Sequence, residues 1–243
     1  MTTPLALPLT VLTGFLGAGK TTVLNRLLRD PDLADTAVLI NEFGEVAIDH
    51  LLVEHVEDGV MLLSSGCLCC SIRGELVGAL EDLARRVDNG RCSQISRVVI
   101  ETTGLADPAP VLHSVLAHPY LVQRFPIDGV VTVVDAINGL ATLDAHPEAV
   151  KQVAVADRIV LAKTDLVADP AGAAEFARLV DRLARLAPAA RRLDAARGEA
   201  TSSAAPPAAD VGVPGTRFVR APAVAAPRML MERPLQPKCR AGS

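Results

Sequence analysis

Along the first 190 positions, short runs of apolar and β-branched residues alternate with stretches whose apolar residues recur at helical spacing. Most of the runs are continuously apolar, which is typical of strands buried on both faces of a parallel sheet. Strands are therefore predicted at 9–14, 37–41, 59–63, 97–101, 129–135 and 158–163. The helical spacing predicts helices over 21–30, 75–87, 110–119 and 173–186.

This alternation of strand and helix predicts an α/β fold, a mostly parallel doubly wound sheet with helices on both faces. The pattern ends near residue 200, so we expect one domain over 1–199. Residues 200–243 hold seven of the 17 prolines and ten alanines without a sustained period. They are predicted to form a low-complexity tail, in which 216–221 is a candidate edge strand.

Charge and hydropathy exclude several kinds of partner. The net charge is −4, and the tail carries six of the 24 Lys/Arg but two of the 28 Asp/Glu, so the rest of the chain is more acidic than the whole. An acidic body argues against a nucleic-acid surface, which needs clustered Lys and Arg. The sequence has no uninterrupted apolar run of about 18 residues and no secretory signal pattern at its start. We expect a cytoplasmic protein with neither nucleic-acid nor membrane partners.

The segment "GFLGAGKT" (14–21) satisfies the pattern G-x-x-x-x-G-K-S/T between a predicted strand and a predicted helix. Its glycines let backbone N–H groups surround phosphate, and the helix dipole favours the same anion. Lys20 is expected to contact the β- and γ-phosphates, and the Thr21 hydroxyl to bind Mg²⁺. A chance glycine-rich turn is the alternative, which the strand–loop–helix context disfavours. The predicted nucleotide contacts in this P-loop are Gly14, Gly17, Ala18, Gly19, Lys20, Thr21 and Thr22.

Two later segments complete the predicted pocket. "RVVIETTG" (97–104) is an apolar strand that ends in an acid, a Walker B arrangement, in which Glu101 would hold Mg²⁺ and Gly104 would approach the γ-phosphate. The alternative is that Glu101 merely caps a strand. In "LAKTD" (161–165), the Asp165 carboxylate can accept hydrogen bonds from guanine N1–H and N2–H₂, while the Lys163 stem packs over the base. GTP is therefore the favoured nucleotide.

Three of the five cysteines, Cys67, Cys69 and Cys70, lie within four positions. Cys67 and Cys70 have the C-x-x-C spacing that offers two thiolates to tetrahedral Zn²⁺, and Cys69 can supply a third. Co²⁺ accepts the same ligands. A redox-sensing disulfide and inert buried thiols are the alternatives, but clustered cysteines in a reducing cytosol favour a metal site.

A fourth metal ligand has to come from another segment. Glu42 in "NEFGE" (41–45) is the first candidate and Glu45 the second. The segment follows the second predicted strand, where GTPases carry a nucleotide-sensitive switch. A ligand there would make metal affinity depend on whether GTP or GDP is bound.

The segments "TGFLGAGKTT", "NEFGE", "GCLCCSIRGEL", "ETTGLADP", "VVTVVDA" and "AKTD", in this order, resemble the CobW-like P-loop GTPases, over roughly residues 8–200. This resemblance implies a GTPase that binds Zn²⁺ or a neighbouring divalent metal and delivers it to a client metalloprotein. It implies slow turnover, with Lys20, Thr21 and Glu101 positioning the phosphates for attack by water. The residues identify no catalytic base, and they leave the oligomeric state open, with a homodimer among the options.

The sequence departs from the family pattern in two places. The family's guanine motif usually opens with Asn, Ser or Thr, and here that position is Ala162, which we expect to weaken GTP affinity without removing the guanine preference. Family members usually carry a second, smaller C-terminal domain, whereas residues 200–243 show no such pattern. The alternative function is therefore a truncated module that binds nucleotide and metal without delivering the metal. Client-stimulated turnover would separate the two.

Overall fold

The computed structural model describes residues 6–30, 33, 35–41, 60–63, 71–90 and 95–199. Several predictions fall on other residues and so lie outside the described part of the chain. These are the cysteine cluster, Glu42 and Glu45, and the whole of 200–243 with its candidate strand.

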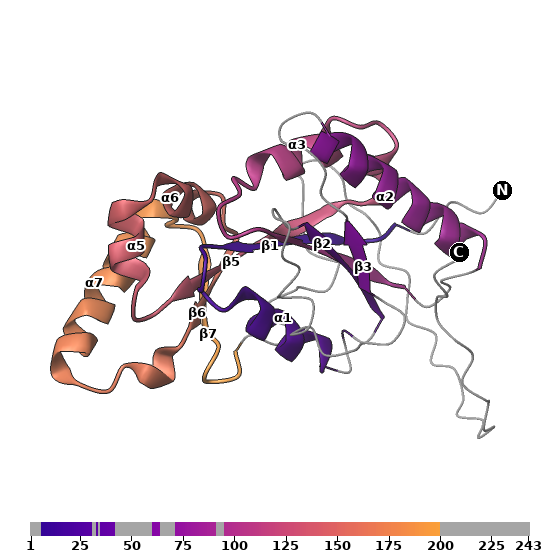
Figure 1. The fold of residues 1–243 in the computed structure, drawn as a ribbon. Helices are drawn as coiled ribbons and strands as arrows, with labels where there is room; N and C mark the ends of the chain where they lie inside the picture. Colours follow the sequence, from indigo (N-terminus) through magenta and orange to yellow (C-terminus); the bar gives the residue numbers. More distant parts are fainter. Residues whose placement is uncertain are drawn as a thin grey trace, which may run out of the picture.

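A seven-stranded sheet forms the centre of the molecule (Figure 1). Its strand order is β3-β2-β4-β1-β5-β6-β7, and every neighbouring pair is parallel. The predicted parallel sheet is therefore confirmed, and all six predicted strands are present with bounds shifted by at most two residues. The strands are β1 (Leu9–Gly14), β2 (Thr36–Asn41), β3 (Val60–Leu63), β4 (Arg97–Thr102), β5 (Ile127–Asp135), β6 (Arg158–Ala162) and β7 (Arg191–Asp194).

Helices cover both faces of the sheet, as predicted. On one face α1 packs through Val23, Leu24 and Leu27 against alternate strand residues, while α2, α3 and α4 bury the other face. At the β6–β7 end, α5, α6 and α7 enclose a third apolar cluster (Figure 1). The helices are α1 (Lys20–Leu28), α2 (Ser71–Asp88), α3 (Ala109–Leu116), α4 (Leu121–Arg124), α5 (Gly139–Ala145), α6 (Pro147–Ala154) and α7 (Pro170–Leu186), with a 3₁₀ turn at Thr164–Leu166.

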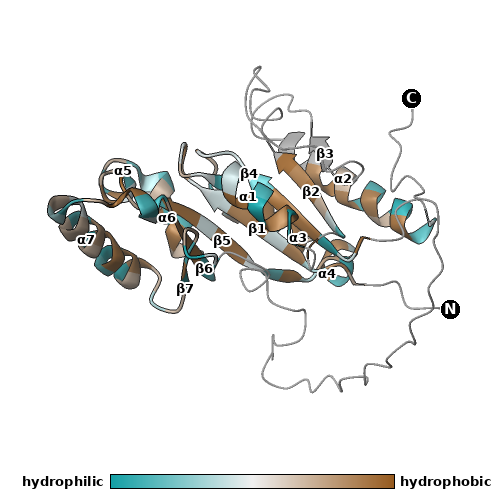
Figure 2. Cartoon of the chain, turned by 90° about the horizontal axis from the view of Figure 1, so that it is seen from below, coloured by the Kyte–Doolittle hydropathy of each residue, from teal (hydrophilic) through white to brown (hydrophobic). Residues whose placement is uncertain are grey.

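The hydropathy of each element, shown in Figure 2, explains why the inner strands could be predicted from the sequence and the edge strand β7 could not. Strand β2 is drawn mostly brown, because residues 37–40 are all apolar and face helices on both sides of the sheet, whereas β1 and β5 carry buried threonines among their apolar residues. By contrast, β7 has the sequence "RRLD", and within it only Leu193 is fully buried. An edge strand with one buried residue has no apolar run to detect.

Helices α4, α5 and α6 were not predicted, and α6 shows one reason. It has eight residues, and its buried positions are Ala149, Gln152 and Val153. A polar glutamine in the buried stripe removes the apolar periodicity on which helix prediction depends. In the described part of the chain, no helix has the length and apolar character needed to span a bilayer.

Candidate nucleotide site

The P-loop joins the carboxyl end of β1 to the first turn of α1. Its turn is closed at the Phe15 carbonyl, which accepts hydrogen bonds from the Ala18 N–H at 3.2 Å and from Lys20 Nζ at 3.3 Å. Gly19 precedes the helix in a left-handed conformation with φ of 99°. The first N–H groups of α1 have no partners within the helix, and they lie at its positive end. The loop thus has the local geometry of an anion site.

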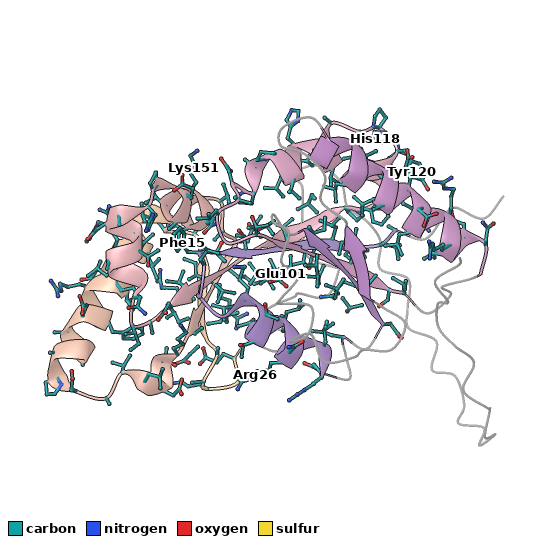
Figure 3. All side chains as sticks on the ribbon, viewed as in Figure 1. Phe15, Arg26, Glu101, His118, Tyr120 and Lys151 are labelled. Atoms are coloured by element: carbon teal, nitrogen blue, oxygen red, sulfur yellow. The ribbon has the colours of Figure 1, made fainter. Side chains whose placement is uncertain are left out.

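Glu101 lies at the carboxyl end of β4, beside the P-loop strand. In the parallel register it pairs with Leu12 of β1, and it is 6% exposed. Figure 3 shows Glu101 between the sheet and α1. The Thr21 hydroxyl donates a hydrogen bond to Glu101 Oε1 at 3.4 Å. The fold therefore brings together the two side chains that the sequence assigns to Mg²⁺. Both offer oxygen, the ligand that Mg²⁺ prefers.

Lys163 connects the end of β6 to the P-loop. Its backbone is left-handed, with φ of 62°. Its Nζ donates to the Gly17 carbonyl at 2.8 Å and to Asp135 Oδ2 at 2.7 Å. Asp165 follows in the 3₁₀ turn with its side chain exposed. Of the two predicted base-recognition residues, Lys163 therefore contacts the phosphate loop directly, and Asp165 follows it by two residues.

Asp135 is a site residue that the sequence did not reveal. Its position after "VVTVV" predicts a turn, and the turn is present, since Oδ1 accepts from the backbone N–H groups of Ile137 at 2.8 Å and Asn138 at 3.2 Å. Its other oxygen binds Lys163. Burial alone would raise the pKa of Asp135, but hydrogen bonds from Lys163 and Asn138 outweigh it and hold the pKa below its usual value. A buried strand that ends in an acid, next to the P-loop strand, was the available signal.

Asp135→Asn should destabilise the fold by about 1–2 kcal/mol at pH 6, because it removes a charge-assisted hydrogen bond to a half-buried lysine. A group whose pKa is lower in the folded state stabilises the fold above its unfolded pKa, and this stabilisation is lost as pH falls through the folded pKa. The difference from wild type should therefore shrink at pH 3. Urea unfolding at the two pH values measures it.

Asp144→Asn is the matched control, because Asp144 lies exposed on α5. Its effect should be small and the same at both pH values. A stability difference for Asp135→Asn that is equal at pH 6 and pH 3 would contradict the assigned role of the Asp135 carboxylate.

The other residues predicted to contact the nucleotide differ in how exposed they are. Ala18 is 3% exposed under the loop, and Thr22 is exposed on the first turn of α1. Ala162 is buried, and its Cβ lies 3.6 Å from where a side chain on Gly19 would begin. The position that departs from the family pattern therefore faces the P-loop. Within the described ranges, no three His, Cys, Asp or Glu residues form a metal-binding group. The proposed Zn²⁺ ligands lie outside those ranges.

Comparison with known families decides what kind of P-loop domain this is. Residues 8–191 match the family described as "CobW/HypB/UreG, nucleotide-binding domain". The chain belongs to this family. The match runs from the residue before β1 to the first residue of β7, so the CobW/HypB/UreG domain contains the P-loop, Glu101, Asp135 and Lys163.

Curated relatives of this CobW/HypB/UreG chain include two zinc chaperones. It is 45% identical over 177 residues to the zinc chaperone YjiA of Escherichia coli, covering 73% of this chain and 54% of YjiA. It is 36% identical over 228 residues to the zinc chaperone CobW of Pseudomonas aeruginosa, covering 82% of this chain and 59% of that protein. The chain thus spans between half and two thirds of the length of these relatives.

Solved structures give the same fold. The Zn(II)-bound YjiA GTPase from E. coli superposes with a TM-score of 0.58 at 36% identity, covering 77% of this chain and 57% of that one. The hydrogenase maturation factor HypB of Archaeoglobus fulgidus superposes with a TM-score of 0.55 at 18% identity, covering 80% and 84%. The second likeness extends the shared fold to a more distant member.

Proposed function

We propose that this chain is a GTP-hydrolysing metallochaperone of the cytoplasm, which binds Zn²⁺, or Co²⁺ in its place, and delivers it to a client metalloprotein. The observation that carries the proposal is the 3.4 Å contact between Thr21 and Glu101 at the start of the P-loop helix. It supports hydrolysis, because a P-loop that only bound anions would not need an acid from the neighbouring strand there. The named zinc chaperones among the relatives support the metal cargo.

In this proposal each part of the nucleotide has its own residues. Lys20 and the backbone N–H groups of 17–21 bind the phosphates, and Thr21 and Glu101 hold Mg²⁺. When bound, Mg²⁺ neutralises charge that develops on the phosphate oxygens. Lys163 packs along the base while its ammonium holds Gly17, and the exposed Asp165 carboxylate accepts the guanine N–H groups.

The Zn²⁺ cargo would be held by Cys67, Cys69, Cys70 and Glu42. Three thiolates and a carboxylate make a tetrahedral set that suits Zn²⁺. Glu42 directly follows Asn41, the last residue of β2, which is parallel to the Walker B strand β4 with Asn41 opposite Thr102. A nucleotide-dependent shift at this end of the sheet would therefore reach a Zn²⁺ ligand within one residue. We propose that the cage assembles in one nucleotide state and opens in the other.

The test is Zn²⁺ affinity with a non-hydrolysable GTP analogue and with GDP, measured by competition with a chromogenic chelator. We expect a difference of at least tenfold between the two states, which corresponds to about 1.4 kcal/mol of coupling free energy. A Cys67/Cys69/Cys70→Ser triple variant should lose tight Zn²⁺ binding and still bind GDP. Cys92→Ser is the matched control, since the sequence gives this lone cysteine no role in the cluster. Equal Zn²⁺ affinities in the two nucleotide states would refute the coupled site.

A further inference from the structure

Helix α6 contacts the segment that links the Walker B strand to α3. This segment, residues 103–108, is called the Walker B loop below. Gln152 of α6 donates through Nε2 to the carbonyl of Gly104 at 3.1 Å and to the carbonyl of Ala106 at 3.0 Å. One side-chain amide therefore fixes the loop at two points, on both sides of Leu105.

The orientation of this amide is set by its partners. Both acceptors are carbonyl oxygens, so a flipped amide would place Oε1 against two other oxygens. Gln152 is 1% exposed, so water does not reach its side chain. In the orientation that binds the loop, Oε1 is buried and has no hydrogen-bond partner among the described residues. A buried unsatisfied polar atom destabilises a fold, and such a cost is expected where the group has a function.

The rest of the residue is held as firmly. Thr132 on β5 donates from Oγ1 to the Gln152 backbone carbonyl at 2.7 Å, which fixes α6 to the sheet. The neighbouring Lys151 forms an ion pair at 3.4 Å with Asp107, which lies in the same loop two residues before α3. Figure 3 shows Lys151 on α6, above Phe15 of the P-loop. Two consecutive helix residues thus contact the same loop, one buried and one exposed.

The loop that Gln152 holds is pressed against the P-loop. A Cβ on Gly104 would lie 2.7 Å from the Leu16 backbone N and 2.8 Å from its Cα, so the two backbones touch. The P-loop is tied to the α6 region separately, since the Phe15 ring stacks on His146 at 4.4 Å between centroids. A shift of Gly104 relative to the P-loop therefore has to break or stretch the bonds from Gln152.

We propose that Gln152 is a positioning residue for GTP hydrolysis, whose amide holds the Walker B loop so that the Gly104 backbone faces the terminal phosphate in the P-loop. The inference rests on the proposed GTPase function. Two results are expected from it. The loop should become more mobile when the Gln152 side chain can no longer donate hydrogen bonds, and this change should slow GTP hydrolysis more than it weakens GDP binding.

The first experiment uses Gln152→Leu, with Gln123→Leu on the exposed side of α4 as the matched control. At saturating GTP, we expect kcat to fall roughly tenfold, because the loss of the two neutral hydrogen bonds that hold the loop leaves Gly104 less well placed toward the γ-phosphate. The dissociation constant for GDP should stay within about twofold, because GDP lacks the γ-phosphate. Gln123→Leu should match wild type in both. Equal losses of GDP affinity and kcat, or no loss of kcat, would overturn the assignment.

A second variant tests the donor itself. Gln152→Glu has nearly the same shape, but its carboxyl can donate one hydrogen bond when neutral and none when ionised. Its kcat relative to wild type should therefore fall as pH rises. A ratio that does not change with pH would count against the proposal.

Hydrogen–deuterium exchange separates this inference from the proposed function. The Ala106 N–H donates to the Thr103 carbonyl within the loop, so its exchange reports loop opening. Exchange over 103–108 should speed up in Gln152→Leu and not in Gln123→Leu. If wild type hydrolyses no GTP but the loop loosens in Gln152→Leu, the proposed function fails, the role in hydrolysis fails with it, and Gln152 only holds the loop. If the loop exchanges at the wild-type rate, the positioning role fails whatever the turnover.

Discussion

Glu101→Gln is expected to lower the turnover of GTP about a hundredfold, or about 2.7 kcal/mol of transition-state stabilisation. The amide keeps the size of the side chain and can still accept a hydrogen bond from Thr21, which lies 3.4 Å away. It removes the negative charge that would hold Mg²⁺ in a 6% exposed position. Steady-state hydrolysis at saturating nucleotide, repeated across a Mg²⁺ titration, measures both the loss of rate and the weaker Mg²⁺ dependence.

The matched control is Glu175→Gln, which removes the same charge from the exposed surface of α7. It should leave turnover unchanged, because its ion pair with Arg178 is solvent-exposed. If Glu101→Gln hydrolyses GTP at the wild-type rate with the same Mg²⁺ dependence, Glu101 does not hold the ion. The acid would then be only the buried end of a strand.

The parts of the fold that the sequence predicted are those whose burial is uniform. Val98, Val99 and Ile100 are all buried, so β4 is a continuous apolar run that needs no knowledge of its neighbours. The short elements depend on their neighbours instead. Strand β7 pairs with the edge of β6, where Leu193 lies opposite Val160. That edge exists only once the rest of the sheet has formed.

The candidate site divides in the same way. Lys20 and Thr21 were predictable, because a P-loop is local: one strand, one turn and one helix hold all of its groups. Asp135 and Gln152 act through residues about 28 and 48 positions away, Lys163 and Gly104. Nothing near either residue in the sequence marks those partners. Strand order brings them together, since β5 lies between β1 and β6 at the carboxyl edge of the sheet.

Gly14 has a structural role that the P-loop motif does not predict, and its replacement has the largest expected effect on the free energy of unfolding. As the first glycine of the P-loop pattern, it was predicted to help wrap phosphate. It is also the last residue of β1, paired with Val133 of β5, with φ of 144°. A Cβ there would lie 2.4 Å from the Val133 carbonyl oxygen and 3.1 Å from its N. Both obstacles are backbone atoms of a central strand, so they cannot move aside cheaply.

Gly14→Ala should therefore lower the free energy of unfolding by about 3 kcal/mol, from a strained backbone together with displacement of β1 from β5. Urea unfolding without nucleotide measures this apart from any effect on binding. The control is Gly90→Ala, where φ is 71° and no atom of the other described residues lies within 4 Å of the added Cβ, so the backbone strain of about 1 kcal/mol remains. If the two variants lose the same stability, the contact with Val133 contributes nothing and the phosphate turn alone explains Gly14. A larger loss in Gly14→Ala would mean that this glycine is required by the sheet before any nucleotide binds.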